Sequence, residues 1–390
     1  MPLPLYYNWR NLVRRRMSTA LTFVVVAVVV FVLSALLAFA AGISASLAAT
    51  GSSRNILVLK PGATAESTSL LVPDEVARLH QTPGVARDAD GNLLLSQELC
   101  IQTSIPRREQ HGALANVAVR GVDEVAFKVH PEIQWVEGRM FRPGAMEVVV
   151  GEAARDRYAN LELGGTIELG RLANRSFTVV GIFEAAGGAL ESEIWGPRTL
   201  FVDAYGRYFN SSVALRLAEN ADAEEAIKYI NGPAVELEAK RETDYYKDLS
   251  TKTREIVILA VVLVGIMGIG AVFAVANTMF AAVDGRRREI AMLRTIGFGR
   301  TAILTAFLIE STLICTVACS LGLAASLFLN GSRQDFLSDT TWTVLAYELR
   351  VTPGIAASAL IVALFVGVIG AVAPAVRASR IRVIEALRKA

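Results

Sequence analysis

Four long apolar runs dominate the pattern of hydrophobic and polar positions in this chain of 390 residues. They are Ala20–Ile43, Ile256–Val283, Ile303–Leu329 and Gly354–Val376. A bilayer core of ~30 Å takes ~20 residues of helix, so each run is long enough to cross it. The pattern therefore predicts an α-helical membrane protein with four transmembrane helices and one large extracytoplasmic domain between the first two.

Composition agrees with this prediction. Hydrophobic residues make up 53% of the chain, and the mean hydropathy is +0.43, whereas a soluble globular domain would be nearer balance. The formal net charge is only +2, so the chain as a whole has no strong electrostatic preference, and we expect no nucleic-acid partner. The distribution of the charges is more informative than their sum.

The first apolar run could be mistaken for a secretory signal peptide, because Arg14, Arg15 and Arg16 precede it and small residues follow it. A signal peptide has an apolar stretch of only ~7–15 residues, and this one is much longer. We therefore expect an uncleaved signal anchor, preceded by a cytoplasmic amphipathic segment over residues 1–19.

The short connecting segments predict the orientation, because basic residues gather on the cytoplasmic side. Arginines precede the first run, fill the segment between the second and third, and follow the fourth. The segment between the third and fourth has only Arg333 and Arg350, offset by acidic residues. We expect both termini and the segment between the second and third runs to be cytoplasmic. The predicted boundaries are spans at 20–43, 254–283, 301–329 and 354–376, an extracytoplasmic domain with its stalk at 44–253, a cytoplasmic loop at 284–300, a short outer loop at 330–353 and a cytoplasmic tail at 377–390.

The outer segment has the pattern of strands, helices and turns that is typical of an α+β domain. Short runs with strand-like composition end at glycine or proline, and two helical stretches stand near the ends of the segment. The predicted helices are Pro73–Gln81 and Asp222–Ile230, and the predicted strands are NILVLK from Asn55, ANVAVRG, MEVVVG, TIELG, FTVVGIF, Ser212–Leu217 and AVELEA. Strand, helix and strand at both ends, with a strand-rich piece between, predict a split sheet that carries a β insertion.

No catalytic constellation is readable in the outer segment. For His80, His111 and His130 we favour surface or structural roles, and for Trp135 packing. Gly187 and Gly188 predict a flexible loop, which either contacts a partner or has no further role. Cys100 has no cysteine partner in this segment, so no disulfide framework is expected. Cys315 and Cys319 are interpreted as small packing residues in an apolar run. We therefore expect this chain to bind no metal and no cofactor.

The polar stretch Thr243–Arg254 leads into the second apolar run without a helix breaker. We interpret it as a stalk that extends the transmembrane helix, although an ordinary solvated linker has the same composition. Within that run, Gly265, Gly268 and Ala271 have the small-residue spacing that allows close helix approach, and exposure to lipid is the alternative.

The segment between the second and third runs predicts a short amphipathic helix over residues 286–296. Ile290 and Leu293, with Ile296 on the neighbouring face, recur at helical intervals, arginines occupy the other side, and Gly297 ends the helix. Such a helix could lie on the membrane surface or dock into a cytoplasmic partner.

Two polar residues stand within the apolar runs. Asn277 could form a hydrogen bond across a helix pair or simply lie near the cytoplasmic end of its span. Glu310 is about ten residues into its helix, roughly 15 Å from the start. A carboxylate there is costly unless it is paired or solvated, so it has a coupling role or an arginine partner, or else lies near the interface.

The stretch from Asn277 through RREIAMLRTIG to Glu310 resembles the FtsX-like, MacB-type ABC transporter permease family, whose systems are type VII ABC transporters that work by mechanotransmission. The tail APAVRASRIRVIEALR is similar to the family's terminal pattern, although a proline that often precedes its Glu-Ala-Leu is absent. VAVRGVDE, VEGRMF, MEVVVGEAARDRYANLELGGTIEL and FTVVGIF follow the order of the family's periplasmic core. The resemblance covers nearly the whole chain.

The resemblance implies a ferredoxin-like part and a β-rich insertion in the outer domain. It also implies a dimer with a second permease copy or a paralogue, two ABC ATPase subunits, contact with membrane lipid, and a periplasmic adaptor or hydrolase. The cytoplasmic helix would then be the ATPase coupling helix, formed by Arg287, Arg288, Glu289, Ile290, Met292, Leu293, Arg294, Ile296 and Gly297.

The sequence contains no G-x-x-x-x-G-K-[ST] phosphate-binding motif. The resemblance therefore implies that ATP and Mg²⁺ bind to a separate ATPase chain and that this chain is not itself an enzyme. The predicted function is a permease whose periplasmic domain moves to export or extract a lipid, lipoprotein, peptide or drug. The alternative is an ATPase-driven regulator of a cell-wall hydrolase without transport. A membrane-bound enzyme is a third class, which the lack of a catalytic cluster argues against.

Overall fold

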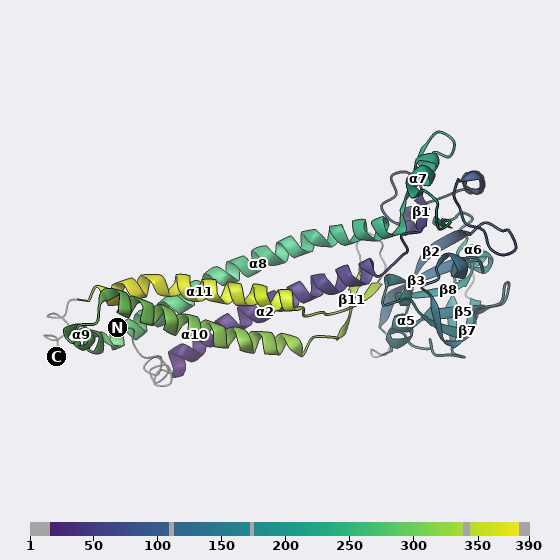
Figure 1. The fold of residues 1–390 in the computed structure, drawn as a ribbon. Helices are drawn as coiled ribbons and strands as arrows, with labels where there is room; N and C mark the ends of the chain where they lie inside the picture. Colours follow the sequence, from purple (N-terminus) through teal and green to yellow (C-terminus); the bar gives the residue numbers. More distant parts are fainter. Residues whose placement is uncertain (1–15, 109–112, 172–174, 338–343, 382–390) are drawn as a thin grey trace. The chain divides into compact units, whose positions relative to one another are not determined.

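The computed structural model describes residues 16–108, 113–171, 175–337 and 344–381 (Figure 1). The chain divides into two compact units. The helical unit combines the N-terminal residues up to Ala41 with Thr253–Ser332 and Leu349–Ala390, and the α+β unit consists of Gly42–Lys252 and Arg333–Glu348. The expected segment 1–19 falls largely outside the described residues, as do His111 and most of the C-terminal tail.

Four long helices build the helical unit. They are α2 (Arg16–Ala48), α8 (Glu242–Gly285), α10 (Arg300–Leu327) and α11 (Pro353–Ser379). Each contains a stretch long and apolar enough to cross a membrane, so the four predicted spans are confirmed. Helix α8 runs unbroken through the polar stretch that we interpreted as a stalk, since no helix breaker interrupts it.

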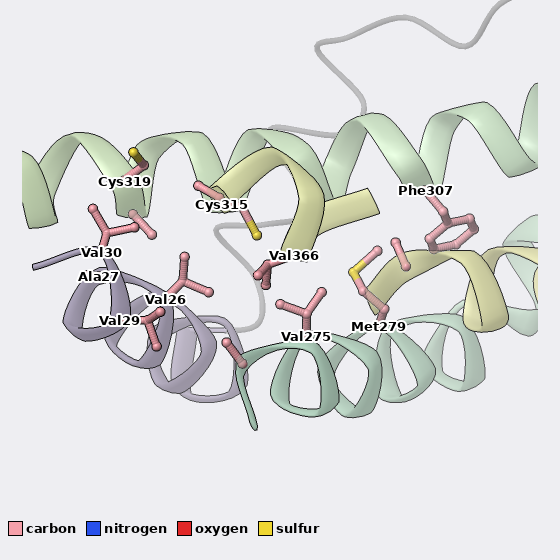
Figure 2. Packing of buried hydrophobic residues seen from close by; sticks show 14 of the residues in the cluster. Val26, Ala27, Val29, Val30, Val275, Met279, Phe307, Cys315, Cys319 and Val366 are labelled. Carbon is pink, nitrogen blue, oxygen red and sulfur yellow. The ribbon is translucent and has the colours of Figure 1, made fainter. Parts of the chain in front are cut away.

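Aliphatic side chains from all four helices form the core of the helical unit (Figure 2). Val26 and Val30 of α2 point toward Cys319 of α10, and Val275 of α8 lies near Val366 of α11. Cys315 and Cys319 are fully buried here and free, so they are packing residues as predicted. Aliphatic packing of this kind gives the bundle its cohesion, because lipid offers little hydrophobic drive for helices to associate.

Close helix approach occurs at other glycines than the sequence suggested. A Cβ on Gly322 would meet the Ala27 carbonyl oxygen at 2.6 Å, and one on Gly370 would meet Val275 at 2.7 Å. Gly265 and Gly268 instead face open space within the chain, with no heavy atom within 4 Å of an added Cβ. The prediction of close packing at these two residues is therefore wrong within one chain, because their side of α8 is turned away from the other helices.

The first part of the α+β unit is a four-stranded antiparallel sheet with two helices. Its elements follow the order strand, helix, two strands, helix, strand, and the spatial order of the strands is β10-β1-β9-β2. This is the ferredoxin-like arrangement that the resemblance implied. The elements are β1 (Asn55–Leu59), α3 (Pro73–Arg78), β2 (Leu95–Pro106), β9 (Ser212–Arg216), α7 (Ala223–Asn231) and β10 (Glu238–Arg241).

The β-rich insertion stands in the chain between β2 and β9. Strand β2 belongs to both parts: its first residues pair with β9, and Leu99–Pro106 pair with β3. From β3 the sheet continues in the order β8-β5-β7-β4, and β6 pairs with β7. The elements are β3 (Leu114–Val122), α4 (Ala126–Val129), β4 (Gln134–Gly138), β5 (Glu147–Gly151), α5 (Glu152–Arg157), β6 (Thr166–Leu169), β7 (Arg175–Glu184), β8 (Glu193–Pro197) and α6 (Arg198–Tyr205).

Short elements complete the α+β unit. Three 3-10 turns are η1 (Glu66–Thr68), η2 (Leu79–Gln81) and η3 (Ala189–Ser192). The residues that we expected as a short outer loop contain an antiparallel pair, β11 (Arg333–Leu337) and β12 (Val344–Glu348).

Several local expectations are corrected by the structure. The strand predicted from AVELEA begins only at Glu238, because Pro233 and the positive φ of 60° at Glu236 hold the preceding residues in a turn. The loop around Gly187 and Gly188 is packed against the end of α2 rather than free. The hydroxyl of Ser46 donates to the Gly187 carbonyl at 3.3 Å, and the N–H of Ala189 donates to Thr50 Oγ1 at 2.6 Å.

A buried charge cluster lies where the two parts of the α+β unit share β2. We call it the Arg120 cluster: Arg120 of β3 contacts Glu66, Glu98 and Glu193, with N–O distances of 2.6–3.1 Å. The guanidinium also lies 5.8 Å from the ring of Trp195. Burial raises the pKa of the Glu98 carboxyl, but the charge of Arg120 and the hydrogen bond with His130 outweigh burial and lower that pKa to about 2. Glu98 therefore stays ionised, and the cluster joins η1, β2, β3 and β8.

Candidate functional site

The predicted amphipathic helix exists and lies at one end of the helical bundle (Figure 1). Helix α9 (Arg287–Thr295) follows the end of α8 at Gly285, and α10 begins at Arg300. Gly297 has a φ of +107°, which favours glycine, and Gly299 is the N-cap of α10. The two glycines thus allow the tight turn that separates α9 from α10.

One face of α9 is docked on the bundle. Ile290 and Ala291 are buried, Ile290 as part of the bundle core, and Leu293 is half-buried. Arg294 is turned the same way: its Nη1 donates to the carbonyl oxygens of Ser379 at 3.4 Å and Ile381 at 2.8 Å. These carbonyls lie at the C-terminal end of α11, where a cation complements the helix dipole.

The other face of α9 is open. Arg287, Arg288 and Met292 are exposed, Glu289 is partly exposed, and Ile296 is 76% exposed just beyond the helix end. Here the expected basic face is wrong at Arg286 and Arg294, whose side chains are directed into the bundle, and Ile296, expected on the face beside the apolar one, is exposed. Arg294 faces inward because the end of α11 offers it acceptors, and Ile296 faces outward because the helix ends before it. The exposed surface thus mixes arginines with two large apolar side chains.

A buried ion pair fixes the start of α9. The Arg286 guanidinium, at the N-cap, donates from Nη1 and Nη2 to the two Glu310 oxygens at 2.8 and 3.0 Å. The side chains of Arg286 and Glu310 are only 7% and 5% exposed. Arg286 also lies over the Phe307 ring at 5.8 Å. Of the possibilities left open for Glu310, the structure shows the arginine pair, in the planar two-point geometry that suits guanidinium and carboxylate.

A second, more exposed set of charges borders the same end of the bundle. Asp284 of α8 contacts Arg287 at 2.9 Å and Arg377 of α11 at 3.4 Å. Arg377 also lies 5.6 Å from the Phe280 ring. Sequence analysis did not single out Asp284 or Arg377, because a lone acidic residue beside an arginine run has no distinctive spacing. Asn277 is exposed on α8.

This end of the bundle has the geometry that a docking surface for a protein would need. A short helix is held by buried apolar contacts, by a cation on the end of α11 and by a two-point ion pair to α10. Its free face presents charge and apolar area together, which suits binding to a protein more than residence in lipid.

Comparison with known families agrees with this geometry. The MacB-like periplasmic core domain matches residues 19–232, and the FtsX-like permease C-terminal domain matches residues 261–383. This chain belongs to the FtsX/MacB-type family of ABC transporter permeases. The α+β unit is therefore the permease's periplasmic core domain, and the second half of α8 together with α9, α10 and α11 lies within the FtsX-like part.

Similarity to individual proteins is lower. The macrolide export ATP-binding/permease protein MacB of Escherichia coli is 27% identical over 288 residues, which are 69% of this chain and 43% of that protein. The protein of the same name from Neisseria gonorrhoeae is 26% identical over 333 residues, 76% of this chain and 48% of that protein. The chain thus spans less than half the length of these relatives and corresponds to their permease-like portion. The crystal structure of the periplasmic region of MacB from Actinobacillus actinomycetemcomitans has a TM-score of 0.36 and 11% identity over 51% of this chain.

With four apolar helices and these relatives, the permease is a multi-pass protein of the bacterial inner membrane.

Proposed function

We propose that an ABC ATPase binds the exposed face of α9 and that its cycle drives movement of the periplasmic domain, which exports or extracts a substrate. The observation that carries this proposal is the division of α9 into a docked face and an open face. Ile290 and Ala291 attach it to the bundle, while Arg288, Met292 and Ile296, spaced four residues apart, form one outward stripe.

The attachment of α9 suits the transmission of force. A push on the open face acts on a helix whose start is fixed to α10 through Arg286 and Glu310 and whose end is fixed to α11 through Arg294. Buried two-point contacts hold register better than apolar contacts, which can slide. The continuous helix α8, from Glu242 to Gly285, supplies the path toward the periplasmic domain.

The finer features of the proposal rest on the family and on the sequence. Both termini and α9 lie in the cytoplasm, as the arginine-rich segments favour. ATP and Mg²⁺ bind to the ATPase, of which two copies act with two permease copies or with a permease and a paralogue. The substrate class is a lipid, lipoprotein, peptide or drug, handled with or without a periplasmic adaptor.

Co-purification tests the ATPase contact. The tagged permease is extracted from its native membrane, and bound proteins are identified by mass spectrometry and assayed for ATP hydrolysis. The double variant Arg288→Glu/Met292→Asp changes only the open face of α9. The matched control is Arg350→Glu, because Arg350 is an exposed arginine just before the start of α11, whereas α9 contacts the other end of that helix.

We expect a protein with an ABC ATPase motif to co-purify with wild type and with Arg350→Glu, and to be lost from the double variant. Retention of the ATPase by a folded double variant would contradict the assignment of α9. If the complex instead retains a cell-wall hydrolase on its periplasmic domain, and no substrate leaves the membrane, regulation without transport replaces export.

A further inference from the structure

A second group of titratable side chains lies beside the Arg120 cluster, and neither the docking surface nor the proposed function uses it. His130 follows α4, Glu132 stands two residues later, and Glu242 is the first residue of α8. His130 and Glu242 are each 2% exposed, and Glu132 is partly buried. More than a hundred residues of sequence separate the first two from the third, so the fold alone brings the three together.

The three side chains converge on one point. His130 Nδ1 lies 3.2 Å from Glu132 Oε1 and 3.5 Å from Glu242 Oε1. The ligand atoms of all three lie within 4.8 Å of one another. Nδ1 carries at most one hydrogen, so it can donate to only one of the two carboxylates. A hydrogen bond therefore explains only one of the two short distances from Nδ1. The second carboxylate oxygen faces a nitrogen that has no further hydrogen to donate.

The spacing agrees with coordination to one small cation. Zinc bonds of about 2.0–2.2 Å in a tetrahedron separate neighbouring ligand atoms by roughly 3.3–3.6 Å. The two distances from Nδ1 are close to that range. An imidazole nitrogen with two carboxylates is a donor set for zinc and similar transition cations, whereas calcium and magnesium prefer oxygen ligands alone.

The imidazole is oriented from its other side, which is an independent observation. His130 Nε2 lies 3.2 Å from Glu98 Oε1, and the other Glu98 oxygen is held by Arg120 at 2.6 Å. A fixed carboxylate on Nε2 places the hydrogen there and directs Nδ1 toward Glu132 and Glu242. Metal-binding histidines have such a carboxylate on the nitrogen that does not bind the metal.

We propose that His130 Nδ1, Glu132 and Glu242 form a three-ligand site for a divalent transition cation, with zinc as the best fit and Glu98 as the residue that orients His130. The metal takes the Nδ1 lone pair, so binding displaces any proton at Nδ1 to solvent.

Within the α+β unit, the site would hold together segments that are distant in sequence. Glu242 Oε2 accepts hydrogen bonds from the Ser52 N–H and from Asn55 Nδ2, both at 2.9 Å, and these residues follow α2. A metal on Glu242 Oε1 would therefore reinforce the contact between the segment after α2 and the first residue of α8. Its role there is structural.

The test uses the full-length permease purified in detergent. The protein is stripped with EDTA, incubated with ZnCl₂, desalted, and analysed for metal content by inductively coupled plasma mass spectrometry. Parallel samples receive Mn²⁺, Mg²⁺ or Ca²⁺. Glu132→Gln is the lead variant, because Glu132 is the most exposed of the three ligands and its replacement disturbs the core least. Glu137→Gln is the matched control, since Glu137 is an exposed carboxylate on the adjacent strand β4.

We expect about one zinc per chain for wild type and for Glu137→Gln, an affinity reduced at least roughly tenfold in Glu132→Gln, and a reduction of about 10- to 100-fold in Glu98→Gln. Zinc should raise the thermal midpoint of wild type but not that of Glu132→Gln. X-ray absorption of the zinc-loaded wild type should show imidazole and oxygen ligands.

Two results overturn the proposal without any variant. One is wild-type protein that keeps no zinc after desalting and shows no thermal shift, which would make the group a proton-held ion-pair cluster. The other is an absorption spectrum with sulfur ligands, which would place the metal on a cysteine. Equal zinc content in wild type and folded Glu132→Gln would also refute the site.

Discussion

Removing Glu310 should destabilise the helical unit more than any exposed charge replacement would. The Glu310→Ala variant leaves the buried Arg286 guanidinium without its two-point partner, and the two side chains are only 7% and 5% exposed. An exposed ion pair contributes about 0–1 kcal/mol. At this burial, breaking one side of a pair costs about 3–5 kcal/mol, because the remaining charge stays out of water.

The Coulomb attraction at this geometry, with N–O distances of 2.8 and 3.0 Å, has the same magnitude as that cost. Unit charges about 4 Å apart attract by about 4 kcal/mol at an effective dielectric constant of 20. Glu310→Gln keeps the shape and an acceptor but loses the charge, so we expect a smaller loss of about 1–3 kcal/mol. The double variant Arg286→Met/Glu310→Leu removes both charges and should recover to within about 1.5 kcal/mol of wild type.

The assay is reversible unfolding of the purified permease in mixed detergent micelles. Wild type, Arg286→Met, Glu310→Leu and the double variant Arg286→Met/Glu310→Leu form a double-mutant cycle. The cycle reports the coupling between Arg286 and Glu310 separately from the loss of packing. A loss below about 1 kcal/mol for Glu310→Ala, together with a double variant no better than the single one, would show that the pair behaves as a solvated contact. The buried-pair reasoning would then be wrong.

Three further predictions use residues away from this pair. Gly322→Ala should lower the free energy of unfolding by about 1–3 kcal/mol, because the added Cβ meets the Ala27 carbonyl. Gly265→Ala should raise it by about 0.5–1 kcal/mol, because the added Cβ meets open space and alanine favours the helix. A change of the same sign in both variants would contradict this packing. The hydrogen bond from Arg139 lowers the pKa of Glu147 to about 2, so on acidification the unfolded chain binds the proton before the folded chain does. The difference in free energy of unfolding between wild type and Glu147→Gln should be largest above about pH 4.5 and vanish toward pH 2. A difference in acid unfolding that does not depend on pH would exclude the ion pair. Because the native cysteines are buried, an impermeant maleimide added to spheroplasts should label Arg350→Cys but label Thr295→Cys only after permeabilisation, and the reverse pattern would invert the proposed orientation.

The spans and many strands could be predicted because local composition determines them. The four apolar runs needed only their length, and strands such as β5 and β7 are rich in β-branched residues. The ferredoxin-like arrangement came from the family resemblance, since strand order depends on pairings between distant segments. The structure then confirmed that order.

Two of the strands that the sequence did not predict, β2 and β8, contain buried charge or residues that are typical of turns. Strand β2 contains Glu98, whose burial is tolerated only because Arg120 and His130 approach from other elements. Strand β8 ends in Gly196 and Pro197, which are typical of a turn. In both cases the stabilising partner is distant in sequence, so the local pattern indicates the wrong structure.

The same reason limits prediction of the candidate site. The existence and limits of α9 follow from its own residues and the glycines after it, but the inward direction of Arg294 depends on the carbonyls that end α11. Glu310 could be predicted to need a partner. Which arginine pairs with it could not be, because several stand in the same segment and only the turn between α8 and α9 brings Arg286 to α10.

Both units use buried charge at the first residues of a helix. Arg286 is the N-cap of α9 and Glu242 the first residue of α8, and each is tied to segments distant in sequence. Apolar contacts would cost less desolvation at either place, so stability alone does not explain the charges. A directional contact between fixed atoms resists sliding and rotation of a helix, whereas an aliphatic contact can shift to a neighbouring groove. If motion passes along α8 and α9, sliding of either helix at its first residues would prevent the motion from being transmitted. A charged contact at the helix start is effective there, because it permits only one register.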